Sequence, residues 1–277
     1  MPPPLKVHGA KVSYYTGKLE GYLRYKEIPY EFVASGPRSQ RLMKQKTGTS
    51  QIPAVELPDG RFMTDTTPMI EYFESEYPQP AVIPKDPLQG FMSRLVEDYA
   101  DEWLWRPAMH YRWSYRKDAL HLSRKIVDEI LPGVPLPALI KRWFIRRRQH
   151  GRWVRGDGVS TETWDHVENT YLKTLEYLEA IFSTRPYLLG AAPTLADFGF
   201  FASIFRHFSQ DPTASDIMRE RAPNVFEWQA RLWNERGSTL SSRALLSDVP
   251  EDWGPILDEI GSTYLPYLCA IRRNVAE

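Results

Sequence analysis

The chain has 277 residues, of which 42% are hydrophobic and 25% are charged, so its composition is that of a globular protein and excludes wholesale disorder. The 35 Lys and Arg residues balance the 35 Asp and Glu residues, and this net charge of +0 argues against a protein devoted to nucleic acid or to coating an anionic membrane. The single cysteine, Cys269, excludes an internal disulfide framework and is compatible with a reducing cytoplasm.

Metal and membrane sites are not expected from the sequence. The six histidines are scattered, and no two of them have the spacing of a protein metal site. The N-terminal residues lack the apolar run of a signal peptide, and no stretch approaches the about 18 apolar residues that a membrane span needs. These features predict a cytoplasmic enzyme or binding protein.

The first 80 residues alternate between extended and helical patterns. Apolar and β-branched runs predict strands, and apolar residues at helical spacing predict helices between them. The predicted strands are residues 5–12, 30–33, 53–57 and 61–64, and the predicted helices are residues 16–27, 38–46 and 66–77. The order is β-α-β-α-β-β-α, and the turn Pro58-Asp59-Gly60 joins the last two strands.

A proline-rich segment separates this region from the rest of the chain. Residues 77–87 contain four prolines, which is typical of an interdomain linker. Strand patterns are not found after it, whereas residues 164–182 carry an apolar stripe long enough for a core helix. The sequence predicts one domain at residues 1–80, a linker at 81–90 and an all-helical domain at 91–277.

The motif Gln51-Ile52-Pro53 opens one of the predicted strands. Only an X-Pro bond adopts the cis form at low cost, about 0.5–1 kcal/mol, and such a bend turns free backbone groups toward a ligand. A trans proline that starts an edge strand is the alternative interpretation.

The motif Asp65-Thr66-Thr67 stands at the start of a predicted helix. An acid and a hydroxyl beside free backbone N–H groups suit the zwitterionic head of an amino acid. The acid would bind the ammonium, and the hydroxyl and N–H groups would bind the carboxylate. Helix capping without a ligand is the alternative interpretation.

A third motif lies near the middle of the helical region. In Gly190-Ala191-Ala192-Pro193-Thr194-Leu195-Ala196-Asp197, Thr194 and Asp197 form a predicted capping box. Together, the element order, these motifs and the spacing between Pro53 and Asp65 resemble the glutathione transferase superfamily. The resemblance is to a Tyr/Ser-type, bacterial-like member with an enlarged helical C-terminal domain, and it covers most of the chain except roughly residues 113–159.

The resemblance implies an α+β thioredoxin-like N-terminal domain followed by an all-α helical bundle. It implies a cytoplasmic, homodimeric detoxification enzyme that uses glutathione as co-substrate and has no metal, nucleic-acid or membrane partner. The residues that match the family's glutathione site are Gln51, Ile52, Pro53, Asp65 and Thr66. In the family the proline is cis, the residue before it pairs with the cysteinyl backbone, and the acid and hydroxyl hold the γ-glutamyl group.

The family activates the glutathione thiol with a Tyr or Ser hydroxyl just after the first strand. Alignment on Leu19-Glu20 places Tyr14 at this position, whereas alignment on the segment 28–31 places Ser13 there. Successive strand residues point to opposite faces, so only one of the two alignments is right. We favour Tyr14 as the catalytic residue, with Ser13 next and then Tyr15 or Thr16. A cysteine-type mechanism is excluded, because Cys269 is the only thiol.

An aromatic-rich run predicts where a bulky hydrophobic or aromatic electrophile would bind. Its apolar members are Trp103, Leu104, Trp105, Met109, Tyr111 and Trp113. Packing in the helical core is the alternative role for these side chains. The function implied is glutathione conjugation or transfer to such an electrophile, and the alternative is a non-catalytic glutathione transferase-like ligand-binding or interaction module.

Two charged clusters have no assigned role. The acidic cluster is Glu97, Asp98, Asp101 and Glu102, and the basic cluster, which contains no acid, is Lys141, Arg142, Arg146, Arg147, Arg148, Arg152 and Arg155. We interpret both as solvated helix faces. A partner surface or the mouth of a site for an anionic substrate is the alternative for the basic cluster.

Overall fold

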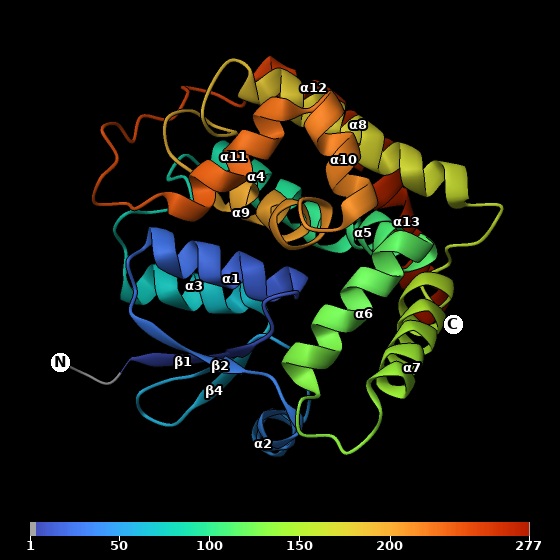
Figure 1. Cartoon of the computed structure of the whole chain (residues 1–277). Helices are drawn as coiled ribbons and strands as arrows, with labels where there is room; N and C mark the ends of the chain where they lie inside the picture. The colour runs from blue at the N-terminus through green and yellow to red at the C-terminus, as the bar shows by residue number, and fades with distance from the viewer. Residues whose placement is uncertain (1–3, 277) are drawn as a thin grey trace.

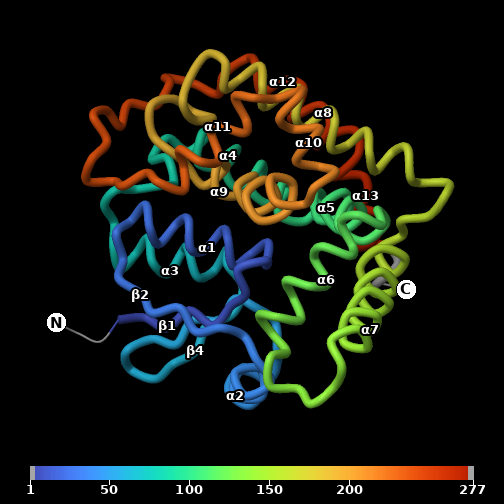
Figure 2. The backbone as a smooth tube through the Cα atoms, in the orientation of Figure 1, coloured from blue at the N-terminus to red at the C-terminus, as the bar shows by residue number. Residues whose placement is uncertain are grey.

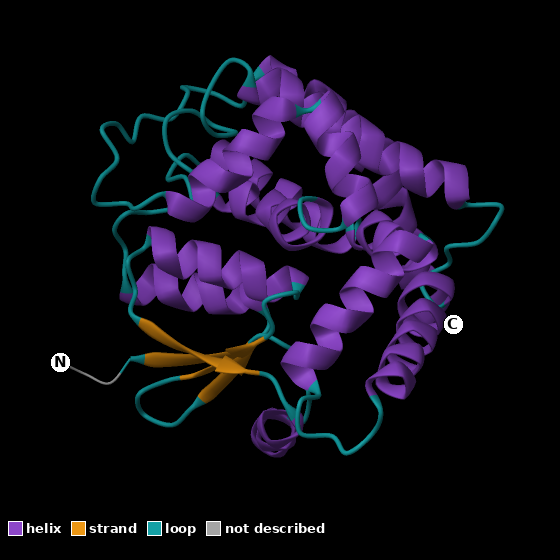
Figure 3. Ribbon diagram, in the orientation of Figure 1, coloured by secondary structure: helices purple, strands orange, loops and turns teal. Residues whose placement is uncertain are grey.

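The N-terminal region forms a four-stranded mixed sheet, as the computed structural model, which describes residues 4–276, shows (Figure 3). The strands are β1 (Leu5–Gly9), β2 (Tyr30–Ala34), β3 (Ala54–Glu56) and β4 (Phe62–Thr64). Their order is β2-β1-β3-β4, with β1 parallel to β2, antiparallel to β3, and β3 antiparallel to β4. The alternating extended and helical patterns produce a βαβ unit followed by a hairpin, as in a thioredoxin-like domain.

Helices cover both faces of this sheet. They are α1 (Tyr14–Tyr25), α2 (Pro37–Thr47) and α3 (Thr66–Glu76). α1 and α3 lie side by side between the sheet and the helical region, and α2 lies on the opposite face (Figure 1). Because α1 is covered on both sides, ten of its twelve residues are buried, among them Leu19, Tyr22 and Leu23.

The remainder of the chain is helical (Figure 2). Its α-helices are α4 (Pro87–Glu102), α5 (Trp105–Ser114), α6 (Arg116–Ile130), α7 (Ala138–His150), α8 (Trp164–Phe182), α9 (Leu195–Ser203), α10 (Pro212–Arg221), α11 (Pro223–Asn234), α12 (Gly254–Glu259) and α13 (Leu265–Ala276). Short π- or 3₁₀-turns complete it: η1 (Gly151–Arg155), η2 (Ile204–Phe208), η3 (Glu251–Trp253) and η4 (Ile260–Tyr264). Within residues 4–276 no helix is both long and apolar enough to cross a bilayer.

Helix α9 lies at the centre of the molecule, and all nine of its residues are buried. It packs on α4 and on α1 and so joins the helical region to the sheet region. Gly199 permits the close approach of α4, because a Cβ there would lie 2.7 Å from the Cα of Glu97. Phe201 fills the corresponding space over Gly21 of α1. A side chain at Gly199 would therefore push α9 away from α4, and one at Gly21 would displace Phe201 between the two regions.

The predicted capping box begins α9 as expected. The Asp197 carboxylate accepts from the Thr194 backbone N–H at 2.8 Å and from the Thr194 hydroxyl at 3.0 Å. Its other oxygen accepts from the Leu188 backbone N–H at 3.0 Å. These bonds satisfy buried backbone donors at the start of the central helix.

A buried ion pair also ties the two regions together. Arg112 of α5 donates to both carboxylate oxygens of Asp211, at 2.8 and 2.9 Å. The same guanidinium donates to the backbone carbonyl of Val12 at 2.7 Å, in the loop between β1 and α1. Such a planar, bidentate pair fixes orientation as well as distance, so this loop is held by the helical region.

The predicted fold class is confirmed, with differences at element ends. β1 stops at Gly9 instead of residue 12, and α1 starts at Tyr14 instead of residue 16, because Ala10 and Val12 pack under the helical region. α4 starts at Pro87, inside the segment 81–90 predicted as a linker. The domain limits at residues 80 and 91 stay predictions.

Candidate functional site

The register of the sheet brings three short segments to one edge. His8 of β1 pairs with Ala54 of β3, and Ala54 pairs with Thr64 of β4. The loop that follows β1, the residues that precede Ala54 and the residue that follows Thr64 therefore all lie at this edge. These segments contain Gln51, Ile52, Pro53 and Asp65 of the predicted glutathione site, and Thr66 follows Asp65 at the start of α3.

Ser13 is the N-cap residue of α1 and is half-buried. Its Oγ accepts from the Thr16 backbone N–H at 3.4 Å, and among the described residues it donates its own proton to no acceptor. An N-cap hydroxyl lies where the positive end of the helix dipole and the free N–H groups favour an anion. Ser13 therefore has both a usable proton and a suitable electrostatic setting.

Tyr14 lies instead in the interior. Its side chain is 1% exposed, and its hydroxyl donates to the Ala100 backbone carbonyl at 2.6 Å. Burial is the main reason that the pKa of this phenol is raised well above its usual range. The hydroxyl expected to contact a bound thiol thus points into the helical region, because α1 begins at Tyr14 and turns it inward.

The two remaining candidate hydroxyls are also engaged or covered. Tyr15 donates to the Asp101 backbone carbonyl at 3.1 Å and stacks on Trp105 with 5.8 Å between ring centroids. Thr16 is fully buried against Gly9, where an added Cβ would lie 2.5 Å from the Thr16 methyl group. Ser13 is the candidate whose position leaves it available to a ligand.

The Ile52-Pro53 peptide bond is cis, as the motif predicts. Pro53 is buried, Gln51 is exposed, and Ile52 is half-buried against a cluster that includes Val12. The backbone groups of Ile52 precede β3 and have no ladder partner at this point.

Asp65 and Thr66 begin α3 and lie beside this segment. Asp65 is the N-cap residue, and its exposed carboxylate accepts from the Thr67 backbone N–H at 3.2 Å. Its φ of 73° is rare for a residue other than glycine, a conformation that costs on the order of 1–3 kcal/mol and persists where surrounding structure requires it. Thr66 is the first helical residue and is buried.

A buried charge network lies directly behind the start of α3. The Lys18 ammonium on α1 contacts the carboxylates of Glu97 and Asp101 on α4, and all three side chains are buried. Glu97 also accepts from the Thr67 hydroxyl at 2.7 Å. Burial, opposed by Lys18 and reinforced by the charge of Glu97, raises the pKa of Asp101 to about 8. The expectation that this acidic cluster is a solvated face is therefore wrong for Glu97 and Asp101, because Lys18 compensates their charge.

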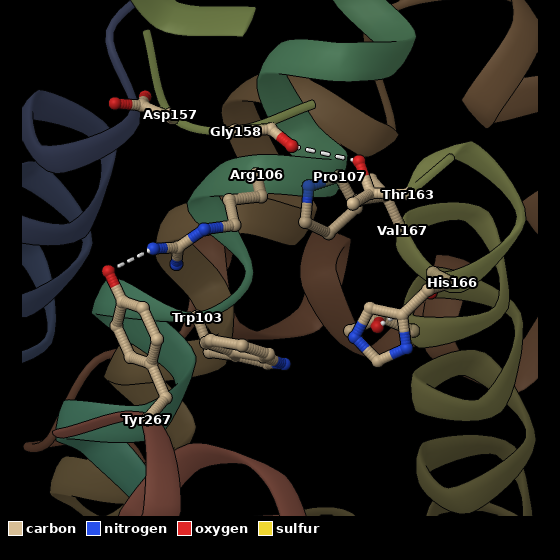
Figure 4. Close-up of a pocket in the computed structure, with 10 residues that line it drawn as sticks. Trp103, Arg106, Pro107, Asp157, Gly158, Thr163, His166, Val167 and Tyr267 are labelled. Carbon is tan, nitrogen blue, oxygen red and sulfur yellow. Dashed lines mark hydrogen bonds between the residues drawn. The ribbon is translucent and has the colours of Figure 1, made fainter. Parts of the chain in front are cut away.

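A cavity with a volume of about 380 Å³ lies between α5, α8 and α13 (Figure 4). Its residues are Trp103, Arg106, Pro107, Asp157, Gly158, Thr163, His166, Val167, Thr170 and Tyr267. Arg106 donates to the Tyr267 hydroxyl at 2.6 Å and lies over the Trp103 ring at 4.8 Å from its centroid. The wall is therefore mostly apolar and aromatic, with one cation.

Few of the predicted pocket residues line this cavity. Trp103 does, whereas Leu104, Met109, Tyr111 and Trp113 are buried in the core. Trp105 lies next to the cavity, and its indole N–H donates to Asp157 at 2.9 Å. Arg106, His166 and Tyr267 are not predicted by any sequence pattern, because they come together only where α5, α8 and α13 cross.

No cluster of three or more His, Cys, Asp or Glu side chains in residues 4–276 has the arrangement of a metal site. The groups at the sheet edge are a hydroxyl, an exposed carboxylate, free backbone groups and two helix N-termini. A thioredoxin-like sheet with a cis proline and two such helix starts, joined to a helical region, defines a two-domain protein of thioredoxin-like architecture.

Comparison with known families is consistent with that architecture. Residues 7–81 match the glutathione S-transferase N-terminal domain, and residues 161–231 match the glutathione S-transferase C-terminal domain. The chain belongs to the glutathione S-transferase superfamily.

Individual relatives are distant. A probable glutathione S-transferase of Solanum tuberosum is 23% identical over 100 residues, which is 35% of this chain and 46% of that protein. Glutathione S-transferase U9 of Arabidopsis thaliana is 29% identical over 96 residues, 34% of this chain and 40% of that protein. The chain thus matches less than half the length of these relatives. The solved beta-etherase LigF of Sphingobium sp. strain SYK-6 shares the fold, with a TM-score of 0.59, 22% identity, and coverage of 84% of this chain and 96% of that one.

The Lys18 network predicts a pH-dependent loss of stability in Lys18→Met. Two buried carboxylates would lose their cation, a change that costs about 3–5 kcal/mol when a buried pair is broken. The pKa of Asp101, which burial already raises to about 8, would then rise further in the folded state. The stability of the variant should therefore continue to fall as the pH increases above about 8, where this group no longer lowers the stability of the unmodified protein.

Urea unfolding of both proteins at several pH values measures this effect. Lys117→Met is the control, because Lys117 pairs with Asp216 at an exposed site and such pairs contribute about 0–1 kcal/mol. If the free energy of unfolding of Lys18→Met is lower than that of the unmodified protein by the same amount at every pH, Lys18 does not compensate these buried carboxylates.

Proposed function

We propose that the protein is a glutathione transferase that binds glutathione at the sheet edge and transfers it to a bulky hydrophobic or aromatic electrophile. The observation that supports this most directly is the joint placement of the cis Ile52-Pro53 bond and the Asp65-Thr66 helix start by the register of β1, β3 and β4. Family membership supports the same ligand.

Each end of glutathione has a matching group in this proposal. The Asp65 carboxylate binds the γ-glutamyl ammonium, and Thr66 with the first N–H groups of α3 binds its carboxylate. The free backbone of Ile52 pairs with the cysteinyl residue, and Gln51 and Pro53 shape this loop. These contacts place the thiol toward the start of α1.

Ser13 is the residue that we propose activates the thiol. A thiol with a pKa near 8.5 is mostly protonated at neutral pH, and a hydrogen bond to the sulfur favours the thiolate. Ser13 has a proton available at the N-terminus of α1, whereas the Tyr14 proton is bonded to Ala100. Lowering the thiol pKa by roughly two units corresponds to about 2.7 kcal/mol of preferential stabilisation of the anion.

The electrophile would bind in the aromatic cavity of the helical region. Trp103 and Tyr267 supply flat apolar surfaces, and Trp105 connects this wall to Tyr15 at the start of α1. A site of this kind excludes water and favours a large apolar substrate. Holding the substrate near a preformed thiolate makes the attack effectively intramolecular.

Asp65→Ala should weaken glutathione binding by about 1.5–3 kcal/mol, the usual value of a hydrogen bond to a charged group. Isothermal titration with glutathione measures the change. Asp59→Ala is the matched control, because Asp59 is an exposed acid in the β3–β4 turn and should leave the affinity unaltered. Absence of binding to the unmodified protein would overturn the proposal and favour the non-catalytic module.

Ser13→Ala should raise the pKa of bound glutathione by one to two units, which corresponds to about 1.5–3 kcal/mol of lost thiolate stabilisation. Tyr14→Phe should leave that pKa unchanged, because its hydroxyl serves Ala100, and should cost only stability. The ultraviolet absorbance of the bound thiolate, titrated against pH, reads the shift. The reverse pattern would restore Tyr14 as the catalytic residue, and no shift in either variant would exclude hydroxyl activation.

We also propose a homodimer that forms through α4. Leu88 and Phe91 are 55% and 61% exposed and lie three residues apart on one face of this helix. Light scattering should give about twice the monomer mass of 32.2 kDa, because burying such a face is favourable. Leu88→Glu combined with Phe91→Glu should give the monomer mass. A monomeric mass for the unmodified protein would refute this.

A further inference from the structure

Helix α7 exposes its apolar side chains instead of burying them. Leu139, Ile140, Trp143 and Phe144 are 50–77% exposed, and Leu136 in the preceding loop is 52% exposed. Ile145 is the one buried residue of this helix. In the described part of the chain, five of the thirteen exposed large apolar side chains fall between residues 136 and 144. A concentration of this kind marks a surface that contacts something other than water.

Basic side chains flank this apolar face. At 100° per residue, Leu139, Ile140, Trp143 and Phe144 share one side of the helix, with Arg142 and Arg146 on one flank and Lys141 and Arg148 on the other. Arg147 lies within the face, 5.8 Å from the Trp143 ring centroid. Arg152 and Arg155 continue the positive charge into η1. The expected solvated face of basic residues stays a prediction, and the structure adds that exposed apolar residues lie between them.

These cations are not neutralised by an acidic neighbour on their own segment. No Asp or Glu occurs between Lys141 and Arg155. Lys141 donates to the backbone carbonyls of Leu131 and Val134, and Arg146 contacts the Ser123 hydroxyl. The face therefore presents an apolar centre within a positive rim.

We propose that α7 is an interfacial helix that binds the protein to an anionic lipid surface. Apolar side chains that include Trp and Phe would enter the boundary between headgroups and acyl chains, and the Lys and Arg rim would contact lipid phosphates and carboxylates. This surface is separate from the proposed glutathione contacts, and the neutral net charge of the whole chain does not oppose a local patch of this kind.

A second copy of this chain fits the face poorly. A two-fold contact places the same patch of both copies together, and here it would oppose seven cations with seven identical cations. An anionic bilayer satisfies both the apolar centre and the positive rim. Lipid binding would also bring the protein's active region near the membrane, since Ile145 of α7 belongs to the same cluster as Val12 and the packed Ile52.

Co-sedimentation with vesicles tests this proposal on the full chain. Vesicles of phosphatidylcholine with phosphatidylserine should bind the protein, pure phosphatidylcholine vesicles should bind it weakly, and high salt should release it. Arg147→Gln combined with Arg148→Gln should weaken binding by about 30-fold, since each basic residue near an anionic surface contributes about fivefold. Trp143→Ser combined with Phe144→Ser should weaken it by at least about tenfold.

Two controls separate this surface from the rest of the molecule. Lys44→Gln combined with Lys46→Gln removes two exposed lysines of α2, and Leu120→Ser removes an exposed leucine of α6; both should bind vesicles as the unmodified protein does. Glutathione titration verifies that every variant is folded. Equal binding to neutral and anionic vesicles, or no binding to either, would overturn the proposal. It would also be overturned if the Trp143/Phe144 substitutions converted a dimer to a monomer and left vesicle binding unchanged.

Discussion

The buried ammonium of Lys18 forms the interaction on which the packing of α1 and α3 against α4 depends. It lies on α1 and holds two carboxylates of α4, and one of them, Glu97, also accepts from Thr67. The start of α3 is joined to the helical region by the hydrogen bond from Thr67 to Glu97, and the Lys18 ammonium compensates the charge of this buried carboxylate. Because one cation faces two buried carboxylates, the network retains a tendency to bind a proton, which appears as the raised pKa of Asp101.

The position of the Ser13 hydroxyl follows from where β1 ends. Arg112 binds the Val12 carbonyl, and the cluster under the helical region covers Ala10 and Val12, so the strand stops at Gly9. Ser13 then becomes the residue that caps α1, and Tyr14 enters the first turn and points toward Ala100. Ser13 and Tyr14 are neighbours in the chain, yet the Ser13 hydroxyl is half-buried at the start of the helix and the Tyr14 hydroxyl is fully buried.

Two helices of the helical region differ in whether their apolar residues are buried or exposed. α9 is buried on every side, because it fills the space between α1 and α4. α7 lies at the periphery on α6 and buries only Ile145, so its other apolar residues stay in contact with solvent. Helix α9 contains no cation and lies in the core, whereas α7 combines its apolar residues with several cations and lies at the surface.

Local patterns in the sequence determined the element order, the cis proline motif, the start of α3 at Asp65-Thr66 and the Thr194–Asp197 capping box. Each of these depends on residues close together in the chain, whose turn, capping and periodicity chemistry is readable without tertiary contacts. The tertiary structure decided the exposure of Ser13 relative to Tyr14, the burial of Glu97 and Asp101, and the choice of Trp103 and Tyr267 for the cavity wall. These outcomes depend on helix crossings between residues 79 or more positions apart, such as Lys18 and Glu97, and sequence periodicity does not specify which faces of two distant helices meet.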